Sequence, residues 1–260
     1  MEDDRLYIQT ELCTGTLADE IVHAGGRLTE RRTYKAMREI LVALDFLHRQ
    51  QMVHLDIKPE NIFLKNDQYK LGDFGLVTRA SCQEDVEEGD SRYMSKELLA
   101  GDHSDLTKSD IFSLGATIYE ICLARPLPMN GQEWQDMRAG ILLPLPNTSP
   151  EMVGLIRNMM EPDFHRRPSA AELLKHPQLL SDEQKALIEE KSKVMQANMQ
   201  LAAAQHQQAA AAAAGQFLPY PYPPQQPHHG GMFIPPPPPL PMKRGLRRAN
   251  TWDGRTFDLS

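Results

Sequence analysis

One octet and one tripeptide constrain this chain more than any other feature of its sequence. The octet His54–Asn61 reads His-Leu-Asp-Ile-Lys-Pro-Glu-Asn, and Asp73–Gly75 reads Asp-Phe-Gly. Asp56 precedes Asn61 by five residues, and Asp73 follows Asn61 by twelve. Phosphoryl transfer needs such a set, because one carboxylate accepts a hydroxyl proton while an amide and a second carboxylate hold a metal ion against the phosphates. We therefore expect the fold to bring these three side chains into one cleft.

Each polar side chain of this set has an expected role. Asp56 is the expected base, and it also positions the acceptor hydroxyl. Lys58 is expected to hold negative charge on the moving phosphoryl group, where preorganised electrostatics act most strongly. Asn61 and Asp73 are the expected ligands of Mg²⁺, and ATP is the expected phosphate donor.

In this order and spacing, the two motifs resemble the catalytic loop and the metal-binding segment of protein kinases. The resemblance implies a protein-kinase-like α+β fold, with a mainly α-helical C-terminal lobe, a hinge strand and short hairpins at the catalytic loop. We expect the sheet of the small N-terminal lobe to be largely absent. The sequence shows no Gly-rich phosphate loop, no strand with a phosphate-binding lysine and no helix with the Glu that pairs with that lysine.

Two residues of the octet have expected roles that are not catalytic. His54 is expected to be structural, packing and hydrogen-bonding beneath Phe74 rather than carrying a proton. Leu55 lies where most protein kinases have Arg, which binds a phosphate on the activation segment through charge-assisted hydrogen bonds. Leu cannot form such bonds, so we expect activity that does not require phosphorylation of that segment.

The N-terminal residues contain a short strand pattern followed by a helix start. Residues 5–12 read as a strand that ends at Cys13, and Thr16 with Asp19 forms a capping-box pattern. In a kinase this is the hinge strand and the first helix of the large lobe, so backbone groups near Glu11 and Cys13 are expected to bond the adenine edge of ATP. The alternative is an ordinary strand-to-helix turn.

Two patterns place the catalytic loop. Residues 29–50 predict a long amphipathic helix, because apolar side chains recur at three- and four-residue spacing. They are Tyr34, Met37, Ile40, Leu41, Leu44 and Leu47. Residues 62–71 predict two short strands around a turn at Asn66 and Asp67, which would set Asn61 and Asp73 side by side.

The resemblance assigns residues 73–97 to the activation segment and predicts two buried carboxylates. Glu97 is expected to pair with Arg167. Asp110, near the start of a mostly apolar helix that runs through Leu123, is expected to bond the backbone of the catalytic loop. Trp134 has two interpretations, an anchor of a surface helix or a substrate-docking side chain.

Charge, apolar run length and cysteine spacing argue against a nucleic-acid-binding protein, a membrane-spanning protein and a cysteine metal site. The net charge is −7, and residues 181–260 carry 8 Lys and Arg against 6 Asp and Glu, so the first 180 residues are strongly acidic. An acidic body does not favour nucleic-acid binding. No apolar run reaches the roughly 18 residues that a membrane span needs. The three cysteines are widely spaced without a metal-ligand pattern, which is typical of reduced thiols in the nucleus or cytoplasm.

Several motifs together resemble the Wee-type kinases over residues 2–180. They are Glu-Gly-Asp-Ser-Arg at 88–92, the octet without its usual Arg, Pro-Met-Asn-Gly at 128–131 with Trp134 and Arg138, and Arg-Pro-Ser-Ala at 167–170 with Lys175 and His176. Wee-type kinases phosphorylate a tyrosine in the Gly-rich loop of cyclin-dependent kinases, and their membrane-associated Myt relatives also modify the neighbouring threonine. The resemblance implies a cyclin-dependent kinase as substrate and a restraint on entry into mitosis.

The same resemblance gives Asp90 a role. Asp90 lies where Ser/Thr kinases usually have Thr, so it is expected to lie near Lys58 and to help shape a site that admits tyrosine. The alternative for Glu87, Glu88 and Asp90 is a solvated acidic loop. Asp73–Leu76 is closer to Myt sequences, whereas Gly89–Ser91 and the lack of a membrane segment favour the Wee branch.

Three regions are expected. The resemblance assigns residues 1–180 to the kinase domain, and composition divides the rest. Residues 181–214 form an expected helical Ala- and Gln-rich extension that begins at a Ser181–Gln184 capping box. Residues 215–260 are an expected disordered tail, rich in Pro and then basic.

The tail contains two candidate binding motifs. Residues 235–241 are a candidate ligand for a proline-binding module, with a flexible spacer as the alternative. Thr251 follows Arg247 and Arg248, which suits phosphorylation by a basic-directed kinase and capture by a 14-3-3 adaptor. The alternatives for the basic cluster are a nuclear-import signal and an unstructured end.

Two interpretations of the whole chain stay open. One is a fragment or incomplete gene model of a full kinase. The other is a non-catalytic kinase-like adaptor that binds partners. The retained Asp56, Lys58, Asn61 and Asp73 favour the first, and the missing lysine strand favours the second.

Overall fold

The computed structural model describes residues 8–82, 86, 87 and 89–215. The chain divides into two units, residues 1–201 and residues 202–260. The expected proline-rich motif at 235–241 and the expected phosphosite Thr251 lie outside the described residues.

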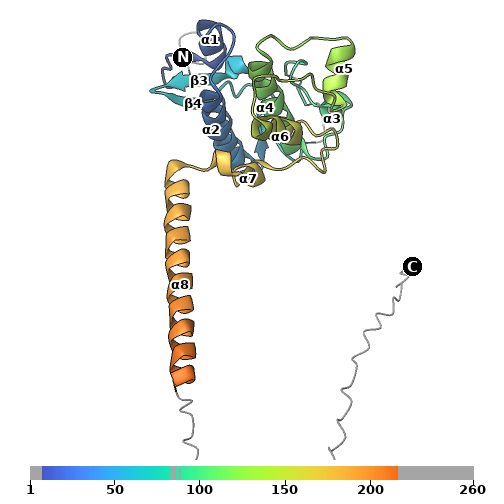
Figure 1. The fold of residues 1–260 in the computed structure, drawn as a ribbon. Helices are drawn as coiled ribbons and strands as arrows, with labels where there is room; N and C mark the ends of the chain where they lie inside the picture. The colour runs from blue at the N-terminus through green and yellow to red at the C-terminus, as the bar shows by residue number, and fades with distance from the viewer. Residues whose placement is uncertain (1–7, 83–85, 88, 216–260) are drawn as a thin grey trace, which may run out of the picture. The chain divides into compact units, whose positions relative to one another are not determined.

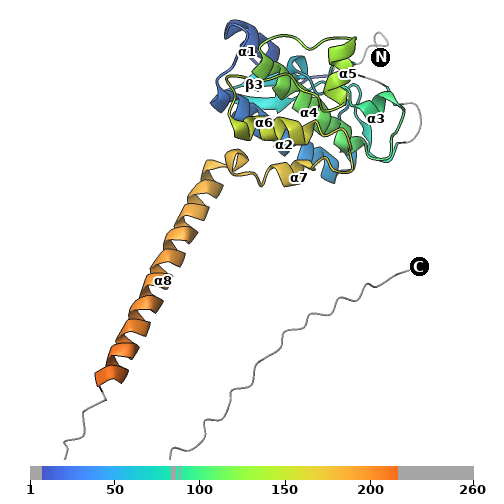
Figure 2. The ribbon, with the colours of Figure 1, turned by 45° about the vertical axis from the view of Figure 1, so that its right-hand side comes forward.

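Helices dominate the described part of the chain (Figure 1). They are α1 (Leu17–His23), α2 (Glu30–Arg49), α3 (Lys96–Leu99), α4 (Leu106–Leu123), α5 (Gln132–Arg138), α6 (Pro150–Met159), α7 (Ala170–Leu173) and α8 (Asp182–Gly215), with the 3-10 turns η1 (Pro59–Asn61) and η2 (Pro177–Leu179). Helix α4 contacts both α2 and α6 (Figures 1 and 2). Because α4 is buried on nearly every side, it forms the centre of the helical body.

Five short strands accompany the helices. They are β1 (Gly15–Thr16), β2 (Met52–Val53), β3 (Ile62–Lys65), β4 (Gln68–Leu71) and β5 (Thr78–Arg79). One antiparallel sheet has the order β1-β3-β4, and β2 pairs with β5. Asn66 and Asp67 have φ angles of 49° and 65°, the left-handed pair that a tight hairpin turn needs. The hairpin predicted over residues 62–71 is therefore confirmed.

The strand predicted over residues 5–12 is wrong for its described part. Residues 8–12 form no regular element, and Ile8 and Leu12 are 76% and 87% exposed. A strand needs a neighbour for its backbone groups. Among the described residues, the backbone here first pairs at Thr14, whose N–H donates to the Leu64 carbonyl at 2.8 Å. Residues 5–7 lie outside the described range.

The predicted helix starts are present. The Thr16 side chain accepts from the Asp19 N–H and the Asp19 carboxylate accepts from Thr16, so the capping box of α1 is confirmed. Thr29 caps α2, which ends at Arg49, one residue before the predicted end. Helix α4 begins at Leu106, because the Asp105 side chain caps it by accepting from the Thr107 N–H, and it ends at Leu123 as predicted.

Two apolar clusters form the core. The larger one joins α2, α4, α6 and α7 and includes most of the predicted face of α2, with Tyr34 half-buried against it. Leu47 is also buried but is not part of this cluster. The smaller one consists of Val53, Leu55, Met94, Leu98 and Leu106. Helices α4 and α6 approach closely at Gly115, where a Cβ atom would lie 2.8 Å from the Cβ of Met159. No helix in the described ranges combines the length and the apolar content that crossing a bilayer requires.

Candidate active site

A buried carboxylate on α4 holds the catalytic loop. Asp110 has no exposed surface, and its two oxygens accept the backbone N–H groups of His54 at 2.9 Å and Leu55 at 2.8 Å. His48, in the last turn of α2, bonds the same carboxylate at 2.9 Å. Leu55 has a φ of 65°, so these bonds hold a strained turn directly before Asp56. The contact between Asp110 and the loop backbone matches the expectation from sequence.

His54 is held at both ring nitrogens. Its Nε2 lies 3.0 Å from the Gly72 carbonyl, and its Nδ1 accepts the Asp56 N–H at 3.3 Å. Both bonds are satisfied by the neutral tautomer with the proton on Nε2. The Phe74 ring packs edge-on at 5.5 Å between centroids. With both nitrogens engaged and no exposed surface, His54 has the surroundings of a structural residue.

Asp56 is the point at which the polar groups converge. Its Oδ2 accepts from Lys58 Nζ and from Asn61 Nδ2, each at 2.7 Å. Its Oδ1 accepts the backbone N–H of Asp90 at 3.1 Å. Asp56 is 9% exposed and Asn61 is 5% exposed. The carboxylate therefore has one orientation, and that orientation depends on the octet and the activation segment together.

Asp73 lies beside Asn61 because of the β3–β4 hairpin. Ile62 pairs with Leu71, and the Gly72 N–H donates to the Asn61 carbonyl at 3.0 Å. Asp73 is exposed, has a φ of 59°, and accepts the Gly75 N–H at 3.3 Å. Strained backbone at such a position is typical of functional loops.

The residues present fit a magnesium ion. Asn61 donates from Nδ2 to the carboxylate and to the carbonyl of Asp56, so its Oδ1 is left as an acceptor that no described residue uses. Together with the Asp73 carboxylate this offers hard oxygen ligands. No cluster of three or more metal-ligating side chains occurs in the described ranges. Mg²⁺ accepts such a sparse set, since phosphates and water complete its shell and the bound ion neutralises phosphate charge.

The expected acidic residue of the activation segment is ion-paired. Asp90 binds Arg92, with Nη2 and Oδ2 2.6 Å apart. Burial by itself would raise the pKa of Asp90, but the hydrogen bonds from the side chain and backbone of Arg92 outweigh it and keep the pKa below its usual value. The charge of Lys58 also lowers this pKa, consistent with the expected proximity of the two residues. Asp90 is thus held by Arg92 and is not simply a solvated acid.

The expected pair between Glu97 and Arg167 is present and buried. Arg167 Nη1 lies 2.5 Å from Glu97 Oε1, and the two side chains are 0% and 6% exposed. Arg167 also donates to the carbonyls of Glu161 at 2.8 Å and Lys108 at 2.7 Å. The pair ties the end of the activation segment to the segment before α7.

The expected hinge residues lie against the β3–β4 hairpin. The Glu11 carboxylate is 2.7 Å from Lys70 Nζ and 2.9 Å from Lys65 Nζ, and these contacts lower its pKa, Lys70 first. Cys13 is half-buried. Their role toward adenine stays a prediction.

Sequence reasoning missed two contributors to the site. His48 reaches Asp110 although nothing in its local pattern distinguishes it from any other helix-end histidine. Arg138 was noted only as part of a motif, yet it is 4% exposed and donates to the carbonyls of Ser91 and Arg92. The only hint of its burial was its spacing, four residues after Trp134 on one helix face.

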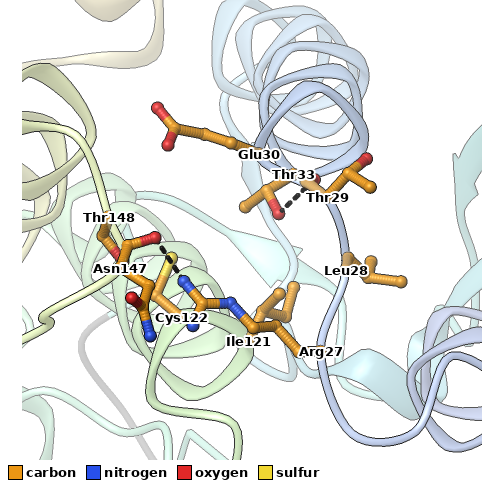
Figure 3. A pocket seen from close by; sticks show the side chains of 9 residues that line it. All are labelled: Arg27, Leu28, Thr29, Glu30, Thr33, Ile121, Cys122, Asn147 and Thr148. Atoms are coloured by element: carbon orange, nitrogen blue, oxygen red, sulfur yellow. Dashed lines mark hydrogen bonds between the residues drawn. The ribbon is translucent and has the colours of Figure 1, made fainter.

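A separate cavity of about 260 Å³ lies at the N-terminal end of α2, between the C-terminal end of α4 and the segment before α6 (Figure 3). Arg27 donates to the Asn147 carbonyl across it, and Cys122 is among the residues that line it (Figure 3). None of its lining residues is an expected site residue.

Comparison with known proteins decides the family. The model of the protein kinase domain matches residues 1–179. The chain belongs to the protein kinase family. Its relatives include the Wee1-like protein kinase of Arabidopsis thaliana, 44% identical over 176 residues that cover 68% of this chain and 35% of the relative.

Two further relatives have related names. The Wee1-like protein kinase 1-B of Xenopus laevis is 36% identical over 210 residues, covering 71% of this chain and 35% of the relative. The membrane-associated tyrosine- and threonine-specific cdc2-inhibitory kinase of Drosophila melanogaster is 40% identical over 183 residues, covering 68% and 34%. The kinase chain described here spans about a third of the length of these curated relatives. Its similarity to Wee-type kinases agrees with the resemblance seen in its motifs.

Proposed function

We propose that this chain supplies the catalytic lobe of a Wee-type kinase, which transfers the γ-phosphate of ATP to a tyrosine of a cyclin-dependent kinase and restrains entry into mitosis. The observation that carries the proposal is the convergence on Asp56 of Lys58, Asn61 and the Asp90 N–H, all within 3.1 Å. A relative at 40% identity is named a cdc2-inhibitory kinase, which supports the same substrate class.

The chemistry assigned to the chain's own residues follows from their contacts. Asp56, oriented by three donors, accepts the proton of the acceptor hydroxyl. Lys58 shares that carboxylate and offsets negative charge on the phosphoryl oxygens. Asn61 and Asp73 hold Mg²⁺. A relative is named for both tyrosine and threonine, so threonine is the second acceptor to test.

The test uses a joined protein, in which this chain is fused to the small lobe of a Wee1-like relative. The joined protein is supplied with ATP, Mg²⁺ and a cyclin-dependent kinase with its cyclin. We expect phosphotyrosine by mass spectrometry, and we expect Asp56→Asn to lower the rate roughly 10²–10⁴-fold, the usual contribution of a positioned base. Asp102→Asn, at an exposed loop position, is the matched control and leaves the rate unchanged. Equal rates for the Asp56 variant and the parent chain would disprove the role of Asp56.

The chain without an added small lobe is expected to transfer little or no phosphate, because its sequence holds no phosphate loop or lysine strand to cover the nucleotide. Robust turnover by this polypeptide alone would contradict that expectation.

A second candidate function is a non-catalytic adaptor. The observation that favours it is the exposed apolar surface that a partner could cover, with Phe74 56% and Leu12 87% exposed. An adaptor would bind a cyclin-dependent kinase equally well with and without the Asp56 change, and it would give no phosphotyrosine in the joined protein.

We further propose that the protein acts in the nucleus, the cytoplasm or both, and that phosphorylated Thr251 binds a 14-3-3 adaptor. Arg247 and Arg248 support the second proposal. A pull-down in which Thr251→Ala binds the adaptor as well as the parent chain would reject it.

The 235–241 segment is proposed as a ligand for a proline-binding module, to be tested by titrating that peptide into such a module.

A further inference from the structure

A groove of about 320 Å³ lies between α3 and α5, elements that lie near one another in both views (Figures 1 and 2). Its apolar lining is formed by Leu99, Ala100, Trp134 and Ala139, and its cations are Lys96 and Arg138. Lys96, Ala100 and Ala139 are exposed, whereas Trp134 and Leu99 are half-buried. The volume is at the low end of the range for ligand sites, which suits one or two side chains of a partner.

Arg138 brings an uncompensated charge to the floor of this groove. It is 4% exposed, and its guanidinium carbon lies 3.8 Å from the Trp134 ring centroid. Its Nη atoms donate only to backbone carbonyls, and its buried Nε has no partner within the described residues. Burial alone lowers the pKa of Arg138 to about 10, because no carboxylate offsets it. A buried cation without an anion is costly, so its presence here calls for a role.

Lys96 adds a second positive charge at the rim. It occupies the first turn of α3, is exposed, and forms no ion pair within the described residues. An apolar groove that carries two unpaired cations is complementary to an apolar side chain next to carboxylates.

The groove is continuous with the segment that leads to the catalytic carboxylate. Trp134 Nε1 donates to the Ser91 carbonyl at 3.1 Å, and Arg138 donates to the same atom at 2.6 Å. The preceding residue, Asp90, donates its N–H to Asp56. A protein bound in the groove would therefore lie along the residues that position Asp56.

We propose that this groove docks the protein substrate through a segment in which an apolar side chain adjoins Asp or Glu. The inference rests on the proposed function for the identity of the partner, a cyclin-dependent kinase, but it concerns binding and not phosphate transfer. It assigns Lys96, Trp134 and Arg138 to substrate recognition away from the phosphate-accepting site.

The test measures binding of the full chain to an immobilised complex of a cyclin-dependent kinase and its cyclin, without ATP. Lys96→Glu and Ala139→Asp each place negative charge at an exposed position of the groove, and each is expected to weaken binding roughly tenfold or more. Lys175→Glu is the control for Lys96→Glu, because Lys175 is also exposed. Ala24→Asp is the control for Ala139→Asp, because Ala24 is exposed and follows the end of α1 with the backbone conformation that Ala139 has after α5. Both controls are expected to bind like the parent chain. Unchanged thermal unfolding midpoints verify that the variants fold.

Each outcome is decisive. The proposal is supported if both groove variants lose binding, both control variants keep it, and the parent chain binds more weakly at high salt. Equal binding by groove and control variants, or no binding by the parent chain, overturns it. The proposal is also overturned if Ala139→Asp abolishes self-association of the chain in sedimentation and leaves binding to the cyclin-dependent kinase unchanged. The groove would then bind a second copy of this chain. The proposed kinase activity is judged separately by phosphotyrosine in the joined protein, so it can stand or fall independently.

Discussion

Arg167 illustrates how much one buried side chain can control. Its guanidinium satisfies the Glu97 carboxylate and the carbonyls of Glu161 and Lys108, and it lies 5.1 Å over the Phe112 ring. A buried ion pair adds little over an apolar replacement of both partners, but removing one partner leaves the other charge without compensation. The contribution of Arg167 to stability is therefore measurable only when Arg167 is replaced and Glu97 is kept.

Arg167→Ala is expected to lower the free energy of unfolding by about 3–5 kcal/mol, because Glu97 would be left buried and unpaired. Urea unfolding followed by circular dichroism measures this. The neighbouring Arg166, whose side chain is 73% exposed, is the control, and Arg166→Ala is expected to change the value by less than about 0.5 kcal/mol. Similar losses in the two variants would show that the buried pair is not the cause.

In the activation segment, residues 73–97, the described residues contact the catalytic loop and the smaller apolar cluster. Asp90 is bonded to Asp56, and Tyr93 is 2% exposed. Leu55 packs with Met94 and Leu98 in the smaller apolar cluster, where a kinase with Arg at this position would need a phosphate partner. Apolar burial does not depend on a modification, so the described part of the segment is ordered by packing.

Combined Thr78→Ala, Ser81→Ala and Ser91→Ala changes are expected to leave phosphate transfer by the joined protein within about threefold of the parent rate. The physical reason is that Leu55 cannot bind a phosphate, and that Ser91 holds Trp134 and Arg138 through its backbone carbonyl, which alanine keeps. Initial rates with a cyclin-dependent kinase as substrate test this. Abolished activity in the alanine variant, recovered when one hydroxyl is restored, would refute it.

At the scale of the whole molecule, the core of the helical body ends at η2. Leu179 is 1% exposed within the larger apolar cluster, and η2 contacts α2. Ser181 and Gln184 then form the predicted capping box, and the side chains of α8 are exposed from Asp182 to Gln205. Exposed side chains add little burial energy, so α8 is not needed to complete the core.

A chain ended after Leu180 is therefore expected to unfold in urea with the same free energy as the full chain, within about 0.5 kcal/mol. A chain ended after His176 loses Leu179 and is expected to be less stable by about 2–5 kcal/mol, the usual cost of removing a large buried side chain. If both shortened chains lost stability equally, α8 would contribute to the fold and the boundary near residue 180 would be misplaced.

The sequence alone determined whatever depends on near neighbours along the chain. The cap at Thr16, the buried face of α2 and the turn at Asn66 and Asp67 follow from residues within a few positions of one another. The octet also predicted that Asp56, Lys58 and Asn61 lie together, because one loop carries them at fixed spacing, and their hydrogen bonds confirm this.

Only the tertiary structure decided which distant groups meet. Asp110 bonds an N–H group 56 residues earlier in the chain, and Arg138 is buried against a carbonyl 47 residues away. The strand expected before residue 13 failed for the same reason, since the backbone of residues 8–12 would need a partner strand and no described strand pairs with it. Local pattern sets what a segment can form, whereas burial and backbone pairing depend on what the fold brings against it.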